Sequence, residues 1–165
     1  MWNLLVIAVL ASMAGVYANF TDHALGGIER SDARETAESM GLYREAVIQY
    51  FTANDVKNFS VDMDALKTSN LVPTWSTLSS RSDESIWANY RAADGTIYIY
   101  ATELPPMNIY SDLADLSRNS YLVGMYKKSG KVLFSPVFGD TGISLAALAS
   151  KHVPDKAPVW IGYRR

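Results

Sequence analysis

The side chains that most often carry enzyme chemistry are scarce in this chain and poorly spaced for it. There is no cysteine, which removes thiolate metal sites and cysteine nucleophiles. The two histidines, His23 and His152, form neither HExxH nor any other pair at metal-ligand spacing. At the end of a predicted short helix, His152 would interact favourably with the helix dipole. We therefore predict that both histidines lie on the surface and that there is no metal site.

Paired carboxylates are the remaining basis for hydrolytic catalysis. The closest pairs are Asp62 with Asp64 and Asp112 with Asp115. Each pair falls at the start of a predicted short helix, where acidic side chains cap the helix and interact favourably with its dipole. A hydrolase would need two carboxylates that converge in one cleft. A hydrolase is therefore the least favoured functional class for this chain.

Motifs for phosphate binding and for a serine nucleophile are also missing. Gly124 and Gly130 resemble the glycines of a phosphate loop, but five residues separate them and Val132 stands where Ser or Thr is required. The segment also falls in a predicted hairpin and not between a strand and a helix. There is no GxSxG, and the SxxK pattern at Ser117 lacks its lysine. We predict no catalytic residue and no cofactor.

The charge distribution argues against nucleic acid as a partner. The chain carries 15 basic and 17 acidic residues, and they are spread along it without a Lys/Arg run. Ten tyrosines raise the aromatic content. Tyrosine is common both in strands and in protein–protein contacts, and half-buried sheet positions are the favoured interpretation.

Residues 1–20 contain no charged side chain and predict a membrane segment. About 20 apolar residues in a helix cross a hydrocarbon core of about 30 Å. Aromatic rings near both ends suit the headgroup regions. The side chains expected to anchor the chain are Trp2, Leu4, Leu5, Ile7, Leu10, Val16 and Tyr17.

The same segment also resembles a signal peptide, with cleavage after Ala18 as the alternative. The short n-region has no Lys or Arg, which favours an uncleaved anchor. Both interpretations place the chain from Asp22 onward across the membrane, although Arg30 and Arg34 argue mildly against export. In a bacterium this predicts a single-pass inner-membrane protein with its C-terminal part in the periplasm.

The remaining chain predicts a linker, residues 21–30, and one domain, residues 31–165. A linker is indicated by Gly26-Gly27. A long amphipathic helix should follow, capped by Ser31 or Asp32 and ending near Ala53. Without its first 20 residues the chain has about 145 residues, the usual size of one domain.

The later elements are short, and their signals change from helical to strand periodicity near Ser85. A helix capped by Asp62 is expected within residues 61–70, and a loop docked by Trp75 within 74–83. Two hairpins are expected at 86–100, with an Asp94-Gly95 turn, and at 121–134. The other expected elements are a helix at 110–118 capped by Ser111, a helix from Asp140 or Thr141 to Ala149, and a strand at 159–163.

This order predicts an α+β fold in which the long helix packs on an antiparallel sheet of hairpins. A membrane helix, a long amphipathic helix and such a sheet together resemble the pilin architecture. Pilins, however, begin with a short basic leader that ends in glycine, and a glutamate follows early in the apolar helix. This chain has neither feature, which argues against a processed, polymerising pilin subunit.

The whole chain resembles the PilM family of conjugative plasmids with thin, type IVb pili. The resemblance rests on MWNLLVIAVLASMAGVYANF at 1–20, on ARETAESMGLYREAVIQYF at 33–51, and on the size of the protein. This family is distinct from the actin-like ATPase of the same name. The resemblance implies a small, non-catalytic inner-membrane protein of the pilus assembly and pilin transport apparatus, with other pilus-assembly proteins as partners.

Two sets of side chains are candidates for contact with those partners. One is the apolar face of the long helix, and the other is an aromatic stripe on the first hairpin. Packing of the two sets against each other is the favoured alternative. The candidate interface residues are Tyr43, Val47, Trp87, Tyr90, Tyr98 and Tyr100. The oligomeric state is left open.

The main alternative function is a periplasmic binding module for a small ligand or glycan, released by cleavage after Ala18. A sugar site would use exposed tryptophans as stacking platforms. Trp75, Trp87 and Trp160 are the candidates for that role.

Overall fold

The computed structural model describes residues 30–80 and 86–164. The predicted membrane segment at 1–20, His23 and Gly26-Gly27 lie outside the described residues, as does the predicted linker apart from Arg30. Among the helices of the described ranges, none is long and apolar enough to cross a membrane.

A long helix occupies residues 30–53 and ends where the sequence predicts, before Asn54. Its exposed side carries an Arg34–Glu38 ion pair of 2.9 Å. The predicted caps are wrong, because Ser31 and Asp32 are themselves helical and the helix already includes residue 30. Apolar side chains at helical spacing make its buried face, namely Ala33, Ala37, Met40, Tyr43, Ala46, Val47, Ile48 and Phe51.

Within the described residues, six strands form one antiparallel sheet in the order β1-β2-β6-β3-β4-β5. The last strand of the chain lies in the middle, where it joins the β1–β2 hairpin to the β3–β4 hairpin. A long helix with an antiparallel sheet confirms the predicted α+β class. The strands are β1 (Trp87–Arg91), β2 (Ile97–Ala101), β3 (Val123–Lys127), β4 (Val132–Ser135), β5 (Gly139–Ser144) and β6 (Pro158–Gly162).

The first hairpin forms as predicted around Asp94-Gly95. The Asp94 carboxylate accepts a hydrogen bond from the Thr96 amide at 2.9 Å. Gly95 has a φ of 91°, a conformation that side chains with a Cβ rarely adopt. The turn residues therefore set the register that places Asn89 opposite Ile99.

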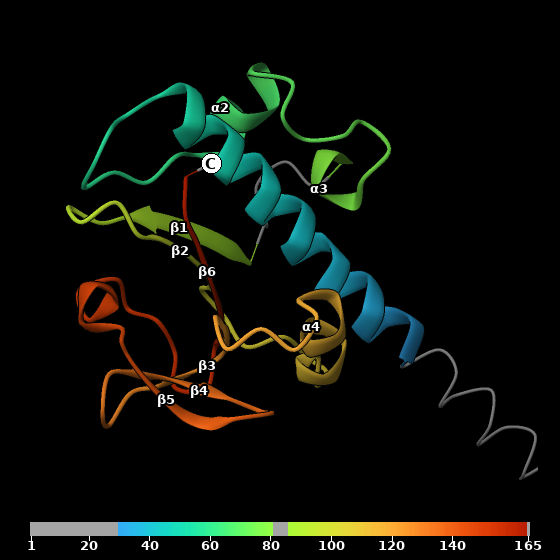
Figure 1. Ribbon diagram of the computed structural model, residues 1–165. Helices are drawn as coiled ribbons and strands as arrows, with labels where there is room; N and C mark the ends of the chain where they lie inside the picture. The colour runs from blue at the N-terminus through green and yellow to red at the C-terminus, as the bar shows by residue number, and fades with distance from the viewer. Residues whose placement is uncertain (1–29, 81–85, 165) are drawn as a thin grey trace, which may run out of the picture.

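The long helix covers one face of the β1–β2–β6 half of the sheet (Figure 1). The Trp87 indole on β1 donates to the Ser39 hydroxyl on the helix at 2.9 Å. Gly162 on β6 leaves room for Ile48, whose Cδ1 would lie 2.8 Å from an added Cβ. This close approach buries every residue of β2 and β6, since the other face is also covered.

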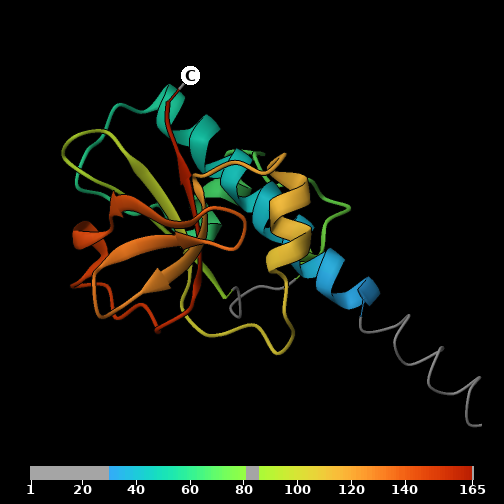
Figure 2. The same ribbon diagram turned by 60° about the horizontal axis from the view of Figure 1, so that its bottom comes forward.

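The opposite face is covered by the segment that connects β5 to β6. Leu145 and Leu148 of this segment are fully buried. On β1, Tyr90 lies between the helix-facing Asn89 and Arg91, so its side chain lies on the opposite face of the sheet. The Lys151 ammonium of the connecting segment lies 4.2 Å from the Tyr90 ring centre on that face. Figure 2 shows this connection beside the sheet. The sheet is thus a middle layer.

Three short helices complete the described chain: α2 (Met63–Thr68), α3 (Thr77–Ser80) and α4 (Tyr110–Leu116). Asp62 is the N-cap residue of α2 as predicted, although its side chain makes no capping hydrogen bond. Ser111 does not cap α4, because it lies within the helix. Just before this helix, the side-chain oxygen Oδ1 of Asn108 accepts a hydrogen bond from the Tyr110 amide at 3.1 Å.

The helix predicted from Asp140 or Thr141 is wrong, since this segment is strand β5 followed by a 3-10 turn at Ala146–Leu148. Gly139 and Gly142 both have positive φ, which interrupts helical geometry. The Asp140 carboxylate accepts from the Gly142 amide at 3.0 Å, a local turn that competes with helix formation.

The predicted loop at 74–83 contains helix α3, and Trp75 does not dock it. Trp75 is 78% exposed, whereas Val72 and Leu78 are buried and attach the segment to the core. The Ser76 hydroxyl donates to the Pro73 carbonyl at 2.7 Å. The turn that contains Trp75 is therefore closed by Pro73 and Ser76.

Candidate interaction surfaces

The predicted interface residues lie mostly inside the protein. Five of the six side chains are buried, and Tyr90 is half-buried. Five are therefore not accessible to a partner in this conformation, and a contact role for them stays a prediction. The buried five are Tyr43, Val47, Trp87, Tyr98 and Tyr100.

A buried amide on β1 connects the sheet to both the long helix and the chain before α2. Asn89 is 2% exposed. Its Nδ2 donates to the Tyr43 hydroxyl and to the Val61 carbonyl, both at 2.7 Å. Its Oδ1 accepts from the Val61 amide at 2.9 Å. The side chain thus pairs with Val61 much as a neighbouring strand would.

This network uses all the hydrogen-bonding groups of the Asn89 side chain except one lone pair of its oxygen. Burial also raises the pKa of the Tyr43 phenol well above its usual range, so the hydroxyl stays protonated at any physiological pH. A buried polar network with so few unused groups fixes the geometry around it.

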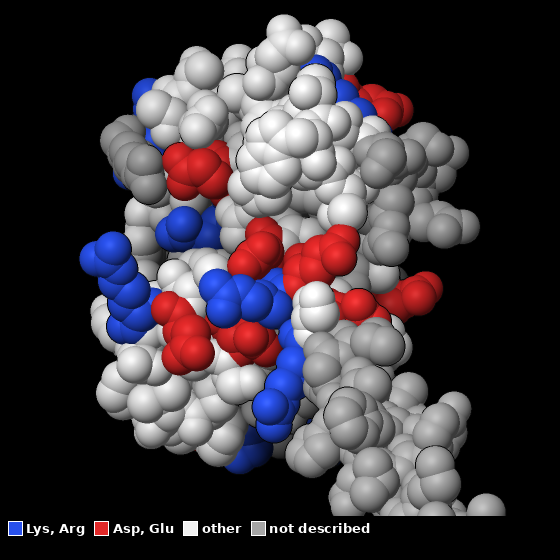
Figure 3. All heavy atoms as spheres, turned by 90° about the vertical axis from the view of Figure 1, so that its right-hand side faces the viewer, with Lys and Arg blue, Asp and Glu red and all other residues white. Residues whose placement is uncertain are grey.

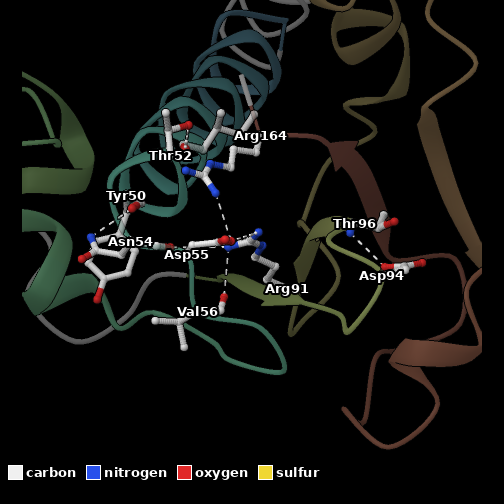
Figure 4. Close-up of polar contacts among 10 residues, drawn as sticks. Tyr50, Thr52, Asn54, Asp55, Val56, Arg91, Asp94, Thr96 and Arg164 are labelled. Carbon is white, nitrogen blue, oxygen red and sulfur yellow. Dashed lines mark hydrogen bonds and ion pairs between the residues drawn. The ribbon is translucent and has the colours of Figure 1, made fainter.

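A second polar cluster joins three parts of the chain at the far end of β1 (Figure 4). The Arg91 side chain is only 4% exposed, and its Nη2 donates to the Asp55 carboxylate at 2.6 Å. Arg164, after β6, lies 3.0 Å from the same carboxylate oxygen. Arg91 Nη1 also donates to the Val56 carbonyl at 3.1 Å.

The cluster holds the loop after the long helix against the sheet. The Arg91 guanidinium carbon lies 5.5 Å from the ring centre of Phe51, at the end of the helix. The backbone of Phe59 pairs with that of Arg91, which covers the outer edge of β1. The hydrogen bond from Arg91 and the charge of Arg164 lower the pKa of the Asp55 carboxyl.

Sequence reasoning missed both clusters, although the strand WANYR contains a signal for them. Alternation places Asn89 and Arg91 on the same face as the core residue Trp87. A polar side chain at an inward position predicts a buried partner. The partners, Val61 and Asp55, are distant in the sequence and carry no signal of their own.

Two of the three tryptophans proposed as sugar platforms are buried. Trp87 donates to Ser39 beneath the long helix, and the Trp160 ring lies 5.0 Å from the Arg44 guanidinium carbon. Of the tryptophans in the described ranges, Trp75 alone is exposed. Trp87 and Trp160 are therefore not accessible as stacking platforms in this conformation, and Trp75 is the exposed candidate of the three.

The search for metal ligands covers the part of the chain that the structure describes. There, no group of three or more His, Cys, Asp or Glu side chains is arranged to hold a metal ion. Asp64 and Asp112 lie in the first turns of α2 and α4, as predicted. His152 is exposed, as predicted. On the face in Figure 3, basic and acidic side chains are interspersed.

A groove of about 590 Å³ lies on β3, β4 and the loop before β6. Met125 and Phe134 form its apolar floor and are half-buried. They are paired in register and lie on the sheet face that the long helix covers farther along. Three lysines and one carboxylate make its rim, namely Lys127, Lys128, Lys156 and Asp155.

Comparison with known proteins identifies one family. The sequence profile of the PilM family matches residues 8–161. A solved structure described as a protein PilM from Escherichia coli B7A is 12% identical, with a TM-score of 0.47, and the match covers 81% of this chain and 93% of that one. No curated protein matches this chain.

Proposed function

Because the chain belongs to the PilM family of plasmid thin-pilus systems, we propose that it is a non-catalytic, inner-membrane-anchored component of the type IV (thin) pilus assembly and pilin transport apparatus. It acts by contacts with other pilus-assembly proteins. The observation that carries this proposal is the family match, which spans residues 8–161.

The arrangement of polar groups supports a scaffold role. Asn89 and Arg91, the buried polar side chains of β1, are used for internal bonds that attach loops to the sheet. Such bonds position surfaces on a rigid body, and rigid surfaces favour specific contacts because little conformational entropy is lost on binding.

The genetic test removes the gene from a conjugative plasmid that encodes a thin pilus. We expect loss of thin pili by electron microscopy and loss of conjugal transfer, both restored by the wild-type gene in trans. Normal piliation and transfer in the deletion strain would overturn the proposed role.

Anchoring is tested separately, by the intact mass of the protein from fractionated cells. We expect the full-length chain in the membrane fraction after an alkaline wash, because about 20 apolar residues suffice for a span. A soluble product that begins at Asn19 would instead show cleavage after Ala18 and remove the anchor from the proposal.

A further inference from the structure

We propose that the groove of Met125 and Phe134 is a docking site for an acidic, amphipathic segment of a partner protein. The inference rests on the proposed function, because the partner would be another protein of the pilus apparatus. The groove is formed by a part of the sheet that no described helix covers.

The floor of the groove is the uncovered part of one sheet face. The same face carries Trp160 on β6, which is buried beneath the long helix, and Val123 on β3, which is buried where α4 contacts that strand. Farther along β3 and across to β4, Met125 and Phe134 are only half-buried. Apolar surface left open on a sheet is available for a partner to cover.

The wall of the groove is held by two backbone–backbone hydrogen bonds and one bond from a backbone amide to a side chain. The Tyr126 amide donates to the Ala157 carbonyl at 2.8 Å, and the Lys156 amide donates to the Tyr126 carbonyl at 2.7 Å. The Lys128 amide donates to the Asp155 carboxylate at 2.8 Å. The groove is therefore preformed, and its volume falls within the usual range for ligand sites.

The charge of the rim indicates that the bound segment is acidic. Lys127, Lys128 and Lys156 line the groove against one carboxylate, Asp155, in a chain whose net charge is −2. The Asp155 carboxylate already accepts the Lys128 amide. Asp140, in register with Phe134, accepts the Gly142 amide. Both carboxylates stay charged while they accept these bonds, so three ammonium groups against two carboxylates leave the groove and its surroundings with a positive excess.

A second cavity adjoins the groove at Lys156. Lys156 also lines a neighbouring cavity of about 300 Å³ formed by residues 104–110, where Leu104 is exposed. The Tyr110 hydroxyl donates to the Lys156 carbonyl, which fixes the boundary between the two cavities. An extended segment can therefore place apolar side chains in both cavities and acidic side chains along the lysines.

A concave floor favours a peptide over a membrane surface. Met125 on β3 and Phe134 on β4 line a recess together with Asp155 and Lys156 of the loop before β6, and a recess suits inserted side chains better than a flat bilayer surface. A peptide strand with alternating side chains can contact both the floor and the lysines.

The direct test measures fluorescence anisotropy of a labelled peptide of about eight residues in which leucine and aspartate alternate. A second labelled peptide, used for comparison, has lysine in place of each aspartate. With the purified full-length chain in a non-ionic detergent, we expect the acidic peptide to bind at least about tenfold more tightly than the basic one. We expect Lys128→Glu/Lys156→Glu to reverse this preference.

The lysines are exposed, so their reversal should leave folding intact, which circular dichroism checks. Lys57→Glu is a control for charge reversal at the surface, because Lys57 is exposed in the loop before α2, outside the groove, and should leave binding unchanged. Equal binding of the two peptides would overturn the proposal. So would a Lys128→Glu/Lys156→Glu variant that still prefers the acidic peptide. Displacement of the acidic peptide by phosphatidylglycerol in mixed micelles with the same detergent, but not by phosphatidylcholine, would assign the groove to lipid and overturn it too.

The same variants separate this proposal from the proposed function. We expect Lys128→Glu/Lys156→Glu to fail to restore pili in the deletion strain at wild-type protein levels, while Lys57→Glu restores them. Full restoration by the double variant would overturn the groove alone. A deletion strain with normal pili would overturn the pilus function itself.

Discussion

The Asn89 amide donates to the Tyr43 hydroxyl at 2.7 Å, and this bond ties the sheet to the long helix inside the core. The same side chain holds the backbone of Val61 through two further bonds. A polar group at this position is favourable only because every partner is present, since unpaired buried polar groups cost stability.

We expect Asn89→Ala to lower the free energy of unfolding by about 3 kcal/mol, because three buried groups lose their partner. Tyr43→Phe should cost about 1 kcal/mol, since Asn89 keeps both bonds to Val61. Urea unfolding followed by circular dichroism measures both.

The exposed Asn108→Ala is the control, because it removes one local bond to the Tyr110 amide. It should cost less than about 1 kcal/mol. Equal losses for Asn89→Ala and Asn108→Ala would contradict the importance of the buried network.

The cluster of Asp55 with Arg91 and Arg164 predicts a dependence of stability on acid pH. Its two partners lower the pKa of Asp55 from an ordinary value of 3.8, so the folded state favours the carboxylate. This contribution is complete above the ordinary pKa and is lost as the pH falls through the lower pKa of the folded state.

The advantage of the wild type over Asp55→Asn should therefore be constant from neutral pH to about pH 4 and shrink below it. Thermal unfolding of both proteins across this range measures the difference. Arg164→Gln should make this stability difference smaller, because the charge of Arg164 is the second cause that lowers the pKa of Asp55. Melting curves that stay a fixed interval apart down to about pH 2 would exclude the linkage.

Elements with local signals were predictable from the sequence. The helix ending near Ala53 and the hairpin turn at Asp94-Gly95 follow from periodicity and turn residues within a few positions. The resemblance at 1–20 and 33–51 predicted the family, which the profile match confirms.

Features that depend on distant contacts were not predictable in this way. Asn89 gives an inward polar signal, but its partner Val61 lies 28 positions away. Trp75 was expected in the core because large aromatic residues are usually buried, yet Val72 and Leu78 dock that segment. The groove at Phe134 depends on which part of the sheet the helices leave open.

Two glycines predict opposite effects of the same substitution. A Cβ at Gly124 would lie 2.2 Å from the Phe134 carbonyl oxygen, which is backbone and cannot move without opening the β3–β4 pair. A Cβ at Gly41 would meet the Trp160 ring at 3.7 Å, an ordinary contact.

We expect Gly124→Ala to destabilise the protein by about 3 kcal/mol. Gly41→Ala should stabilise it by about 0.5–1 kcal/mol, because alanine is the better helix former. Chemical unfolding of the two variants in parallel checks both signs, and stabilisation by Gly124→Ala would contradict the close approach of β3 and β4.

Tyr98 and Tyr163 distinguish core packing from partner contact on the sheet. Tyr98 is 5% exposed on β2, whereas Tyr163 is 55% exposed just after β6. Tyr98→Ser should cost about 3 kcal/mol because it leaves a cavity, and Tyr163→Ser should change stability by less than about 0.5 kcal/mol. Unfolding experiments measure the cost, and complementation of the deletion strain measures assembly. Normal stability of Tyr98→Ser together with loss of pili would contradict the packing role and assign Tyr98 to a partner interface.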